Sequence, residues 1–201
     1  DAIASGLRTK NADGTFSNFQ GGDVRFVDLN GDRIIDEKDM QQLGFSAPRF
    51  HGSFSSKLSL KRFTLDALFT FSQGNEVFNQ LRYFLESASS TDNQLNSVVN
   101  RWRTEGQVTN MPKASFGDPR GNNRFSDRWI EDGSYLRLRN ITLSYDLSFK
   151  EKFVKNATVY LTGNNLLTFT KYMGFDPEFS AGNAGFAQGI DTGLDPLFRS
   201  V

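Results

Sequence analysis

The sequence predicts an all-β chain whose long antiparallel strands cross a membrane as part of a β-barrel. Apolar and polar residues alternate with a period of two over stretches of about ten residues, the length of a tilted membrane-crossing strand. The connections between these stretches are alternately short and long, which is typical of outer-membrane barrels. No uninterrupted apolar run approaches the roughly 20 residues that a membrane helix needs.

The composition excludes several other classes of protein. The 201 residues carry 23 basic and 23 acidic side chains, and this balance argues against nucleic acid binding, which depends on clustered Lys and Arg. The absence of Cys excludes disulfide scaffolds and thiolate zinc sites, and the single His excludes sites with two imidazoles. Only 37% of the residues are hydrophobic although 20 are Phe, and a barrel explains this because only alternate strand residues face lipid.

The N-terminal part is expected to be mostly loop. Residues 1–22 are rich in Gly, Ser, Asn and Asp, which is the composition of turns and loops. Residues 23–29 are a short strand candidate that runs into an acidic cluster. The first residues also lack the basic start and apolar stretch of a signal peptide, so the chain is either cytosolic or a mature or partial sequence.

The acidic cluster at residues 28–39 fits a calcium-binding loop of the D-x-[DN]-x-D type. Calcium is a hard cation that prefers several oxygen ligands, and the spacing supplies them. The expected metal ligands are the side chains of Asp28, Asn30 and Asp32, the backbone carbonyl of Ile34, and the side chains of Asp36 and Asp39. Ile35 is the apolar residue that would anchor the loop to the body of the protein.

Two residues of this loop depart from the calcium-binding pattern. Arg33 stands where Gly is favoured for a sharp turn, and Asp39 rather than Glu closes the loop, as in the dockerin-like calcium loops that it resembles. The alternative is an acidic, solvated turn that holds no metal. Calcium is favoured because so many neighbouring carboxylates repel one another without a cation.

The clearest strand pattern covers residues 50–71, with a tight turn at Lys61-Arg62. Alternate residues form a mainly apolar set, which comprises Phe50, Gly52, Phe54, Ser56, Leu58 and Leu60, and then Phe63, Leu65, Ala67, Phe69 and Phe71. The residues of the opposite parity are mostly polar and include Lys57 and Asp66. Such alternation across a whole hairpin predicts two antiparallel strands with one apolar face.

A second hairpin is expected over residues 141–169. Residues 141–148 alternate in the same way, and a basic turn at 150–156 connects them to a strand over 158–169. The alternation breaks near Arg139, because Leu136 and Leu138 have the opposite parity, so we expect a β-bulge or a change of environment there. The last residues, 197–201, read as the start of another strand and suggest a fragment.

The connections outside these hairpins are long. The first, at 73–133, is expected to contain short helices at 76–87 and 94–102, and the second covers 170–195. A half-buried sheet of a soluble β-sandwich also alternates apolar and polar residues, and this interpretation stays open on the pattern alone. Strands of about ten residues nevertheless exceed the length usual in soluble proteins.

No constellation in the sequence predicts catalysis. His51 lies on the polar parity of a strand, no two carboxylates are paired as acid and base, and no phosphate-binding glycine motif is present. Arg101-Trp102-Arg103 would suit a sugar or an anion, although a helix end with a packed Trp102 is the simpler interpretation. We therefore expect that the protein is not an enzyme.

Three blocks of sequence together resemble a known family. The blocks are Gly22–Asp32, Phe125–Tyr145, and Gly163–Tyr172 followed by Gly174–Glu178. In their order and spacing they resemble the C-terminal part of the SusC/RagA-type TonB-dependent transporters of Bacteroidetes outer membranes. The resemblance covers nearly the whole chain, and the second and third blocks are long and specific.

The resemblance implies a nutrient importer of the bacterial outer membrane. Residues 1–201 would be the C-terminal part of a barrel of about 22 strands closed by a plug. A SusD-like surface lipoprotein would cover its mouth, and TonB would act on the plug to admit an oligosaccharide or a peptide. The plug domain, with the TonB-contacting segment, and the last strand would be absent from this chain, which would not transport by itself.

The strand pattern and the resemblance together predict an orientation. If 61–62 and 150–156 are periplasmic turns, then 73–133 and 170–195 are extracellular loops, and so is the calcium-like loop at 28–39. The apolar parity of 50–71 would face lipid and the opposite parity a polar lumen. The alternative function is a soluble calcium-dependent β-sandwich, such as a carbohydrate-binding or adhesin module; a glycan-acting enzyme has no positive support.

Overall fold

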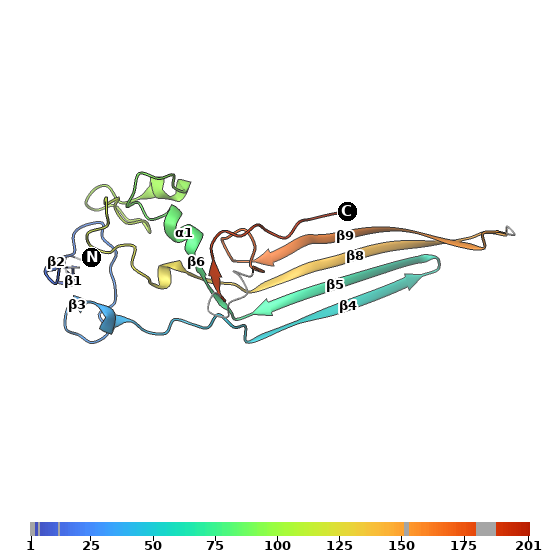
Figure 1. The fold of residues 1–201 in the computed structure, drawn as a ribbon, viewed down its shortest axis with the longest axis horizontal. Coiled ribbons are helices and arrows are strands. Elements are labelled where there is room, and N and C mark those ends of the chain that lie inside the picture. The colour runs from blue at the N-terminus through green and yellow to red at the C-terminus, as the bar shows by residue number, and fades with distance from the viewer. Residues whose placement is uncertain (1–2, 4, 12, 151–152, 180–187) are drawn as a thin grey trace. The chain divides into compact units, whose positions relative to one another are not determined.

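The computed structural model describes residue 3 and residues 5–11, 13–150, 153–179 and 188–201 (Figure 1). The chain divides into two compact units, of which one comprises Asp1–Leu43 and Gln80–Trp129 and the other Gly44–Asn79 and Ile130–Val201. The second unit contains the long strands, and the first consists mainly of loops with short elements. Among the described residues, no helix is both long enough and apolar enough to cross a membrane.

Four long antiparallel strands form the main sheet of the second unit (Figure 1). The order of the strands in the sheet is β4-β5-β8-β9. They are β4 (Phe50–Leu60), β5 (Phe63–Gln73), β8 (Tyr135–Ser148) and β9 (Asn156–Thr170). Both predicted hairpins are therefore confirmed. In the turn of the first hairpin, Lys61 has a left-handed φ of 55°.

The register of the sheet places the apolar residues opposite one another across neighbouring strands. Leu65 pairs with Leu58 on one side and with Leu143 on the other. Phe54 pairs with Phe69, and their rings stack with centroids 4.8 Å apart. This face is exposed, since Phe54 and Leu58 keep 50% and 64% of their surface accessible. The alternation therefore produces an uncovered apolar surface and not a buried core.

The expected bulge lies at Arg139. Pairing of β8 with β5 passes from Asn140 directly to Leu138, and pairing of β8 with β9 skips at the same place. The extra residue shifts the alternation by one position. Leu136 and Leu138 therefore lie on the same apolar face as the apolar residues after the bulge, although their sequence parity is opposite. The break in the sequence alternation is therefore a bulge and not a change of environment.

A smaller sheet of the second unit corrects the prediction of a helix at 76–87. Its order is β10 (Ile190–Asp191), β6 (Glu76–Asn79) and β7 (Ile130–Asp132). The first four residues of the expected helix thus form a strand, and only α1 (Gln80–Leu85) is helical. The reason is tertiary, because β6 pairs with strands that are distant in the sequence. The second expected helix, at 94–102, is a 3-10 helix at Asn96–Asn100.

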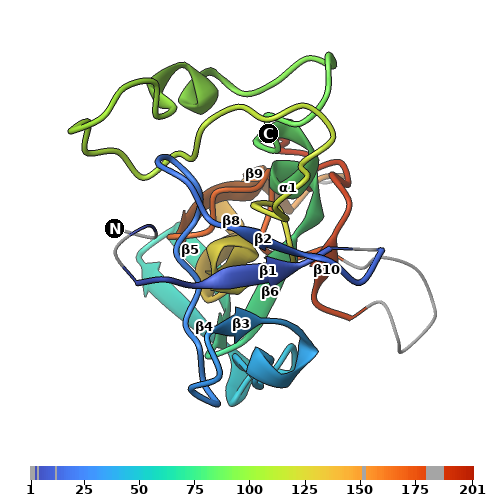
Figure 2. The same ribbon diagram turned by 90° about the vertical axis from the view of Figure 1, so that its left-hand side faces the viewer.

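In the first unit, a small sheet replaces the expected N-terminal loop (Figure 2). Its order is β2 (Phe16–Asn18), β1 (Arg8–Lys10) and β3 (Ile34–Ile35). Leu7, Phe19 and Ile35 form its buried cluster, with Phe26 packed against them. The prediction of loop throughout 1–22 was wrong. The turn-forming residues of this segment connect two strands that are too short to show an alternation of apolar and polar residues. In the described structure, residues 23–29 form no strand, because their partners are loop side chains and not a neighbouring strand.

The other part of the first unit packs around Trp129, which is fully buried. Two guanidinium groups lie over the Trp129 ring, that of Arg128 at 4.3 Å and that of Arg82 at 5.6 Å from its centroid. Tyr83 meets the same ring edge-on. The indole N–H donates to the carbonyl of Arg124 at 3.2 Å. A single aromatic side chain thus organises a unit that has few regular elements.

Candidate functional site

The acidic loop closes over the predicted length. The Asp28 carboxylate accepts hydrogen bonds from the amides of Gly31 at 2.7 Å and Arg33 at 2.8 Å. Arg33 has a φ of 64°, so it adopts the left-handed conformation for which the loop pattern favours Gly. At the other end, Asp39 Oδ1 accepts from the amide of Leu29 at 2.9 Å and so returns to the start of the loop.

Three of the remaining expected ligands, Asn30, Asp32 and Asp36, also accept hydrogen bonds from the loop backbone. The Asn30 amide oxygen accepts from the Asp32 amide at 2.9 Å, and Asp32 Oδ1 accepts from the Ile34 amide at 2.8 Å. Asp36 caps the 3-10 helix at Glu37–Asp39 by accepting from the Lys38 amide. The side-chain oxygens therefore fix the backbone of the loop itself.

These contacts do not assemble a metal centre. Within the described part of the chain, no group of three or more His, Cys, Asp and Glu side chains is placed to hold a metal ion. Asn30 and Ile34, two of the predicted ligands, would contribute an amide and a carbonyl oxygen. Ile35 is only 3% exposed and packs with Leu7 and Phe19, which confirms its role as the anchor of the loop. The loop supplies oxygen atoms suited to calcium, and calcium binding stays a prediction.

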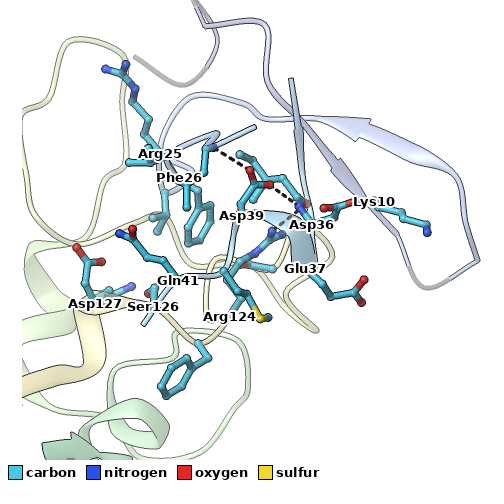
Figure 3. Close-up of a pocket in the computed structure, with 18 of the residues that line it drawn as sticks. Lys10, Arg25, Phe26, Asp36, Glu37, Asp39, Gln41, Arg124, Ser126 and Asp127 are labelled. Atoms are coloured by element: carbon cyan, nitrogen blue, oxygen red, sulfur yellow. Dashed lines mark hydrogen bonds between the residues drawn. The ribbon is translucent and has the colours of Figure 1, made fainter. Parts of the chain in front are cut away.

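A pocket of about 730 Å³ adjoins the acidic loop in the same unit (Figure 3). Arg124 lines it, with its guanidinium 4.6 Å from the centroid of the Phe26 ring. The guanidinium donates to Thr9 Oγ1 at 2.7 Å and to the Ile35 carbonyl at 3.2 Å. Burial lowers the pKa of Arg124. Charged residues of both signs also line the pocket, namely Lys10, Arg25, Asp36, Glu37, Asp39, Asp127 and Arg128.

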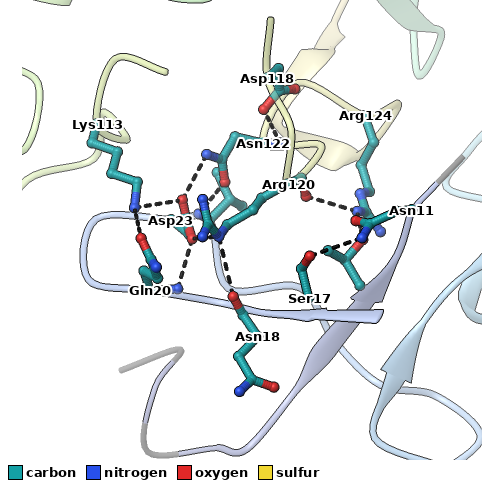
Figure 4. A network of polar contacts seen from close by, with 12 residues as sticks. Asn11, Ser17, Asn18, Gln20, Asp23, Lys113, Asp118, Arg120, Asn122 and Arg124 are labelled. Carbon is teal, nitrogen blue, oxygen red and sulfur yellow. Dashed lines mark hydrogen bonds and ion pairs between the residues drawn. The ribbon is translucent and has the colours of Figure 1, made fainter. Parts of the chain in front are cut away.

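A buried carboxylate ties two distant loops of the first unit together (Figure 4). The Asp23 side chain has no exposed surface and lies 3.2 Å from Lys113 Nζ and 3.5 Å from Arg120 Nε. It also accepts from the Gln20 amide at 2.7 Å and from the Asn122 side chain at 2.9 Å. Because the partners come from both loops, this network holds the loops together.

The polar parity of the main sheet forms cross-strand polar pairs on one face. Lys57 and Asp66, on β4 and β5, form an exposed ion pair at 3.7 Å. The hydroxyl groups of Thr142 and Thr162, on β8 and β9, lie 2.9 Å apart. The two predicted lumen residues are thus on the same face as the threonines, opposite the exposed apolar surface.

At one end of this polar face, Arg137 is almost completely buried, with 1% of its surface exposed. Its Nη2 donates to Asp176, and its Nη1 lies 3.3 Å from Glu178 Oε2. The other oxygen of Glu178 accepts from Arg139 at 2.6 Å. We refer to these four residues as the Arg137 cluster. Both of its acids come from the segment that follows β9.

A second set of buried contacts holds the same segment. The Tyr172 hydroxyl donates to Asp191, and the Met173 amide donates to Glu131 at 2.9 Å. Burial, together with the hydrogen bond to Asp191, raises the pKa of Tyr172 well above its ordinary value. Asp191 is 2% exposed, so the phenol remains neutral beside a buried carboxylate.

The sequence did not predict the Arg137 cluster as a site. Arg137 and Arg139 interrupt an alternating strand, and Asp176 and Glu178 lie in the block Gly174–Glu178 that carried part of the resemblance. The sequence signal for this cluster was the presence of two basic residues in one segment and two acidic residues in another. The pairing could not be derived from it, because many other charged residues were equally possible partners.

The relatives found by comparison with known proteins are TonB-dependent receptors. No protein-family profile matches the chain. The TonB-dependent receptor P26 of Formosa agariphila is 33% identical over 90% of this chain. The TonB-dependent receptor SusC of Bacteroides thetaiotaomicron is 29% identical over 78% of this chain. The chain spans only 19% of the length of the first and 15% of the second.

Solved structures of RagAB match the fold. The RagAB peptide transporter has a TM-score of 0.64 and 32% sequence identity, and the match covers 77% of this chain and 16% of that one. The RagAB peptide importer in its closed-closed state has a TM-score of 0.71 at 25% identity, over 99% of this chain and 21% of that one.

A sheet of long antiparallel strands with one exposed apolar and one polar face, together with these relatives, defines the chain as part of a TonB-dependent receptor. Within this class, the chain belongs to the SusC/RagA type, as the three sequence blocks indicated. Proteins of this type are outer-membrane β-barrel proteins, and not enzymes, which confirms the expectation of a non-catalytic protein. The four strands described here do not close into a barrel by themselves.

Proposed function

We propose that this chain forms the C-terminal part of an outer-membrane importer that takes up an oligosaccharide or a peptide through a plugged β-barrel. The observation that carries the proposal is the main sheet, whose apolar face is exposed while its polar face is hydrogen-bonded across the strands. In a barrel of this kind, the apolar face contacts lipid and the polar face lines the lumen. A soluble β-sandwich would bury the apolar face.

The strand connections support an orientation of the sheet. The turn at Lys61-Arg62 and the link from Ser148 to Asn156 lie at the same end of the sheet, since Phe63 pairs with Tyr145. At the other end, the strands continue into the long links at 73–133 and 170–195. We place the short connections on the periplasmic side and the long links outside the cell, because outer-membrane barrels have short periplasmic turns.

The partners proposed for the whole protein are a SusD-like surface lipoprotein and TonB. Similarity to SusC and to the two-component RagAB supports the lipoprotein. TonB would act through a plug that lies outside the 201 residues of this chain. RagAB is described as a peptide transporter, so a peptide is the first cargo to test, with oligosaccharides as the second class.

The test is uptake by cells that carry or lack the complete gene. Labelled oligopeptides and oligosaccharides are offered separately, and uptake of one class is expected to require the gene, the neighbouring lipoprotein gene and TonB. A strain without the gene that keeps full uptake of every class would contradict the proposal. Uptake that persists without TonB would contradict the energised mechanism but not the identity of the importer.

Calcium at residues 28–39 is a further part of the proposed function. The ion would rigidify a loop on the extracellular side, and a hard, flexible oxygen site suits it better than magnesium, which requires stricter octahedral geometry. Calcium titration of the purified full-length protein should slow hydrogen exchange in this loop and raise thermal stability. Asp32→Ala should abolish both effects. Identical exchange with and without calcium in the natural protein would exclude the site.

A further inference from the structure

The side chain of Arg137 projects from the polar face of the main sheet. In the register of the sheet it lies between Thr70 of β5 and Thr168 of β9, whereas its neighbours Leu136 and Leu138 belong to the apolar face. Alternate residues of a strand point to opposite faces, so the guanidinium stands on the face that carries Thr142 and Asp66.

The acceptors of this guanidinium determine the path of the chain after β9. Asp176 and Glu178 follow the end of β9 at Thr170 by only a few residues, and both reach Arg137. The segment therefore turns back over the polar face and does not continue outward from the strand. Thr70, on the neighbouring strand, has its hydroxyl oxygen buried without a hydrogen-bond partner in the described structure.

Burial of the charges explains why two acids accompany this return of the chain. The side chains of Arg137 and Asp176 keep only 2% and 8% of their surface exposed. A buried guanidinium without a carboxylate partner is strongly unfavourable, whereas a paired one is tolerated. While the segment covers Arg137, the carboxylates of Asp176 and Glu178 compensate its charge; without Arg137, the same segment would bring these two acids onto the sheet without this partner.

Both described arms of the link after β9 are fastened to each other. Asp176 Oδ2 accepts from the Leu197 amide at 3.1 Å, and Tyr172 donates to Asp191. The second arm also reaches β9, where Asn165 donates to the Phe198 carbonyl at 3.1 Å. Residues 171–179 and 188–198, which we call the return loop, are thus connected to each other, and Asp176 and Glu178 connect them to Arg137.

We propose that the return loop is an inward constriction of the transport path and that Arg137 is the positioning residue that holds it closed. The inference rests on the proposed function, in which the polar face lines the lumen. A layer of chain on that face reduces the free width of the opening. Arg137 would consequently limit the size of the ligands that pass, without itself being required to bind them.

The test measures access to the polar face beneath the return loop. A single cysteine replaces Thr70, which is convenient because the chain contains no natural Cys. The full-length protein, purified in detergent and free of other reactive thiols, is treated with maleimides attached to polyethylene glycol of small and large size. Detergent solution makes the result independent of orientation, partner lipoprotein and transport activity.

Two substitutions are compared in this background. Arg137→Met removes the charge at similar volume, and labelling of Cys at position 70 should accelerate about tenfold or more, with the larger reagent gaining most, because the loop opens locally. Lys57→Met is the matched control, since it removes an exposed cation from the same face and should leave labelling unchanged. Glu178→Gln is a milder variant with an intermediate effect, and heat-modifiable migration in gels verifies folding of each protein.

The outcomes separate the proposal from the function on which it rests. Equal labelling of the parent and the Arg137→Met protein would overturn the positioning role of Arg137. Faster labelling with the small reagent alone would overturn the constriction, because the opening would not have widened. A protein that labels as expected but imports neither peptides nor oligosaccharides would contradict the proposed function and leave the constriction standing.

Discussion

The hydroxyl of Tyr172 donates a hydrogen bond to Asp191, and both side chains are buried in the layer that follows the last long strand. A neutral phenol is the proper partner for a buried carboxylate, since a phenolate would place two like charges together. The pair therefore couples the order of the return loop to the protonation of one tyrosine.

The first prediction is that the return loop loses stability in alkaline solution. The folded-state pKa of Tyr172 is raised, so its contribution is full below the unfolded pKa of about 10 and is lost as the pH rises above it. Absorbance near 295 nm should show a late-titrating tyrosine component that decreases in Tyr172→Phe. Protection from hydrogen exchange in the loop, taken relative to the intrinsic rate that rises with pH in both proteins, should fall above pH 10 in the parent and fall less in the variant. An unchanged late phase in Tyr172→Phe would refute the assignment.

The second prediction concerns the apolar face of the main sheet. Leu65 lies at the centre of this face between Leu58 and Leu143, so Leu65→Arg should destabilise the inserted protein by about 2–4 kcal/mol if the face meets lipid near the midplane. Thr64→Arg places the same side chain on the opposite face and is the control. Unfolding by urea from lipid vesicles gives both values, and equal effects of the two substitutions would refute the assignment of the faces.

The third prediction concerns the left-handed residue of the acidic loop. Arg33 has a φ of 64°, which costs a non-glycine residue about 1 kcal/mol. Arg33→Gly should therefore slow hydrogen exchange of residues 28–39, and it should strengthen calcium binding if the ion is bound. Lys38→Gly, in the 3-10 helix of the same loop, is the control and should accelerate exchange. Faster exchange in Arg33→Gly would mean that its side chain stabilises the loop.

The fourth prediction concerns the buried carboxylate of the first unit. Asp23→Asn leaves Lys113 and Arg120 without their acid and should destabilise the local structure by about 3 kcal/mol. Asp66→Asn breaks an exposed pair with Lys57 and should cost less than about 1 kcal/mol. Hydrogen exchange at residues 20–24 and at 57–66 measures the two effects. Comparable small effects would show that the Asp23 network does not hold the loops together.

The prediction from sequence succeeded where interacting residues are close in the chain. Alternation identified the hairpins around Lys61 and the link at 150–156, and the register follows because a shift by one residue would exchange the two faces. The broken parity at Leu136 and Leu138 indicated a bulge or a change of environment near Arg139, and the strand pairing shows a bulge there. In the acidic loop, Arg33 adopts the conformation that its position required.

Prediction failed where a segment takes its structure from a distant partner. Glu76–Asn79 is a strand because it pairs with Ile130–Asp132, although its sequence suits the start of a helix. Residues 23–29 suggested a strand, yet Val24 donates to the side chain of Asn122, which is 98 residues away. No local pattern contains the identity of such partners.

Residue order over a few tens of positions was enough to predict the long antiparallel hairpins, the apolar and polar faces and the family of the protein, and to indicate the bulge. The contact of Arg137 with Asp176, 39 residues further along, and the turn of the chain after β9 back over the polar face became evident only in the folded protein. Both depend on burial, because a guanidinium that is covered by the chain requires a carboxylate partner, and residue order does not say which of the many acids supplies it.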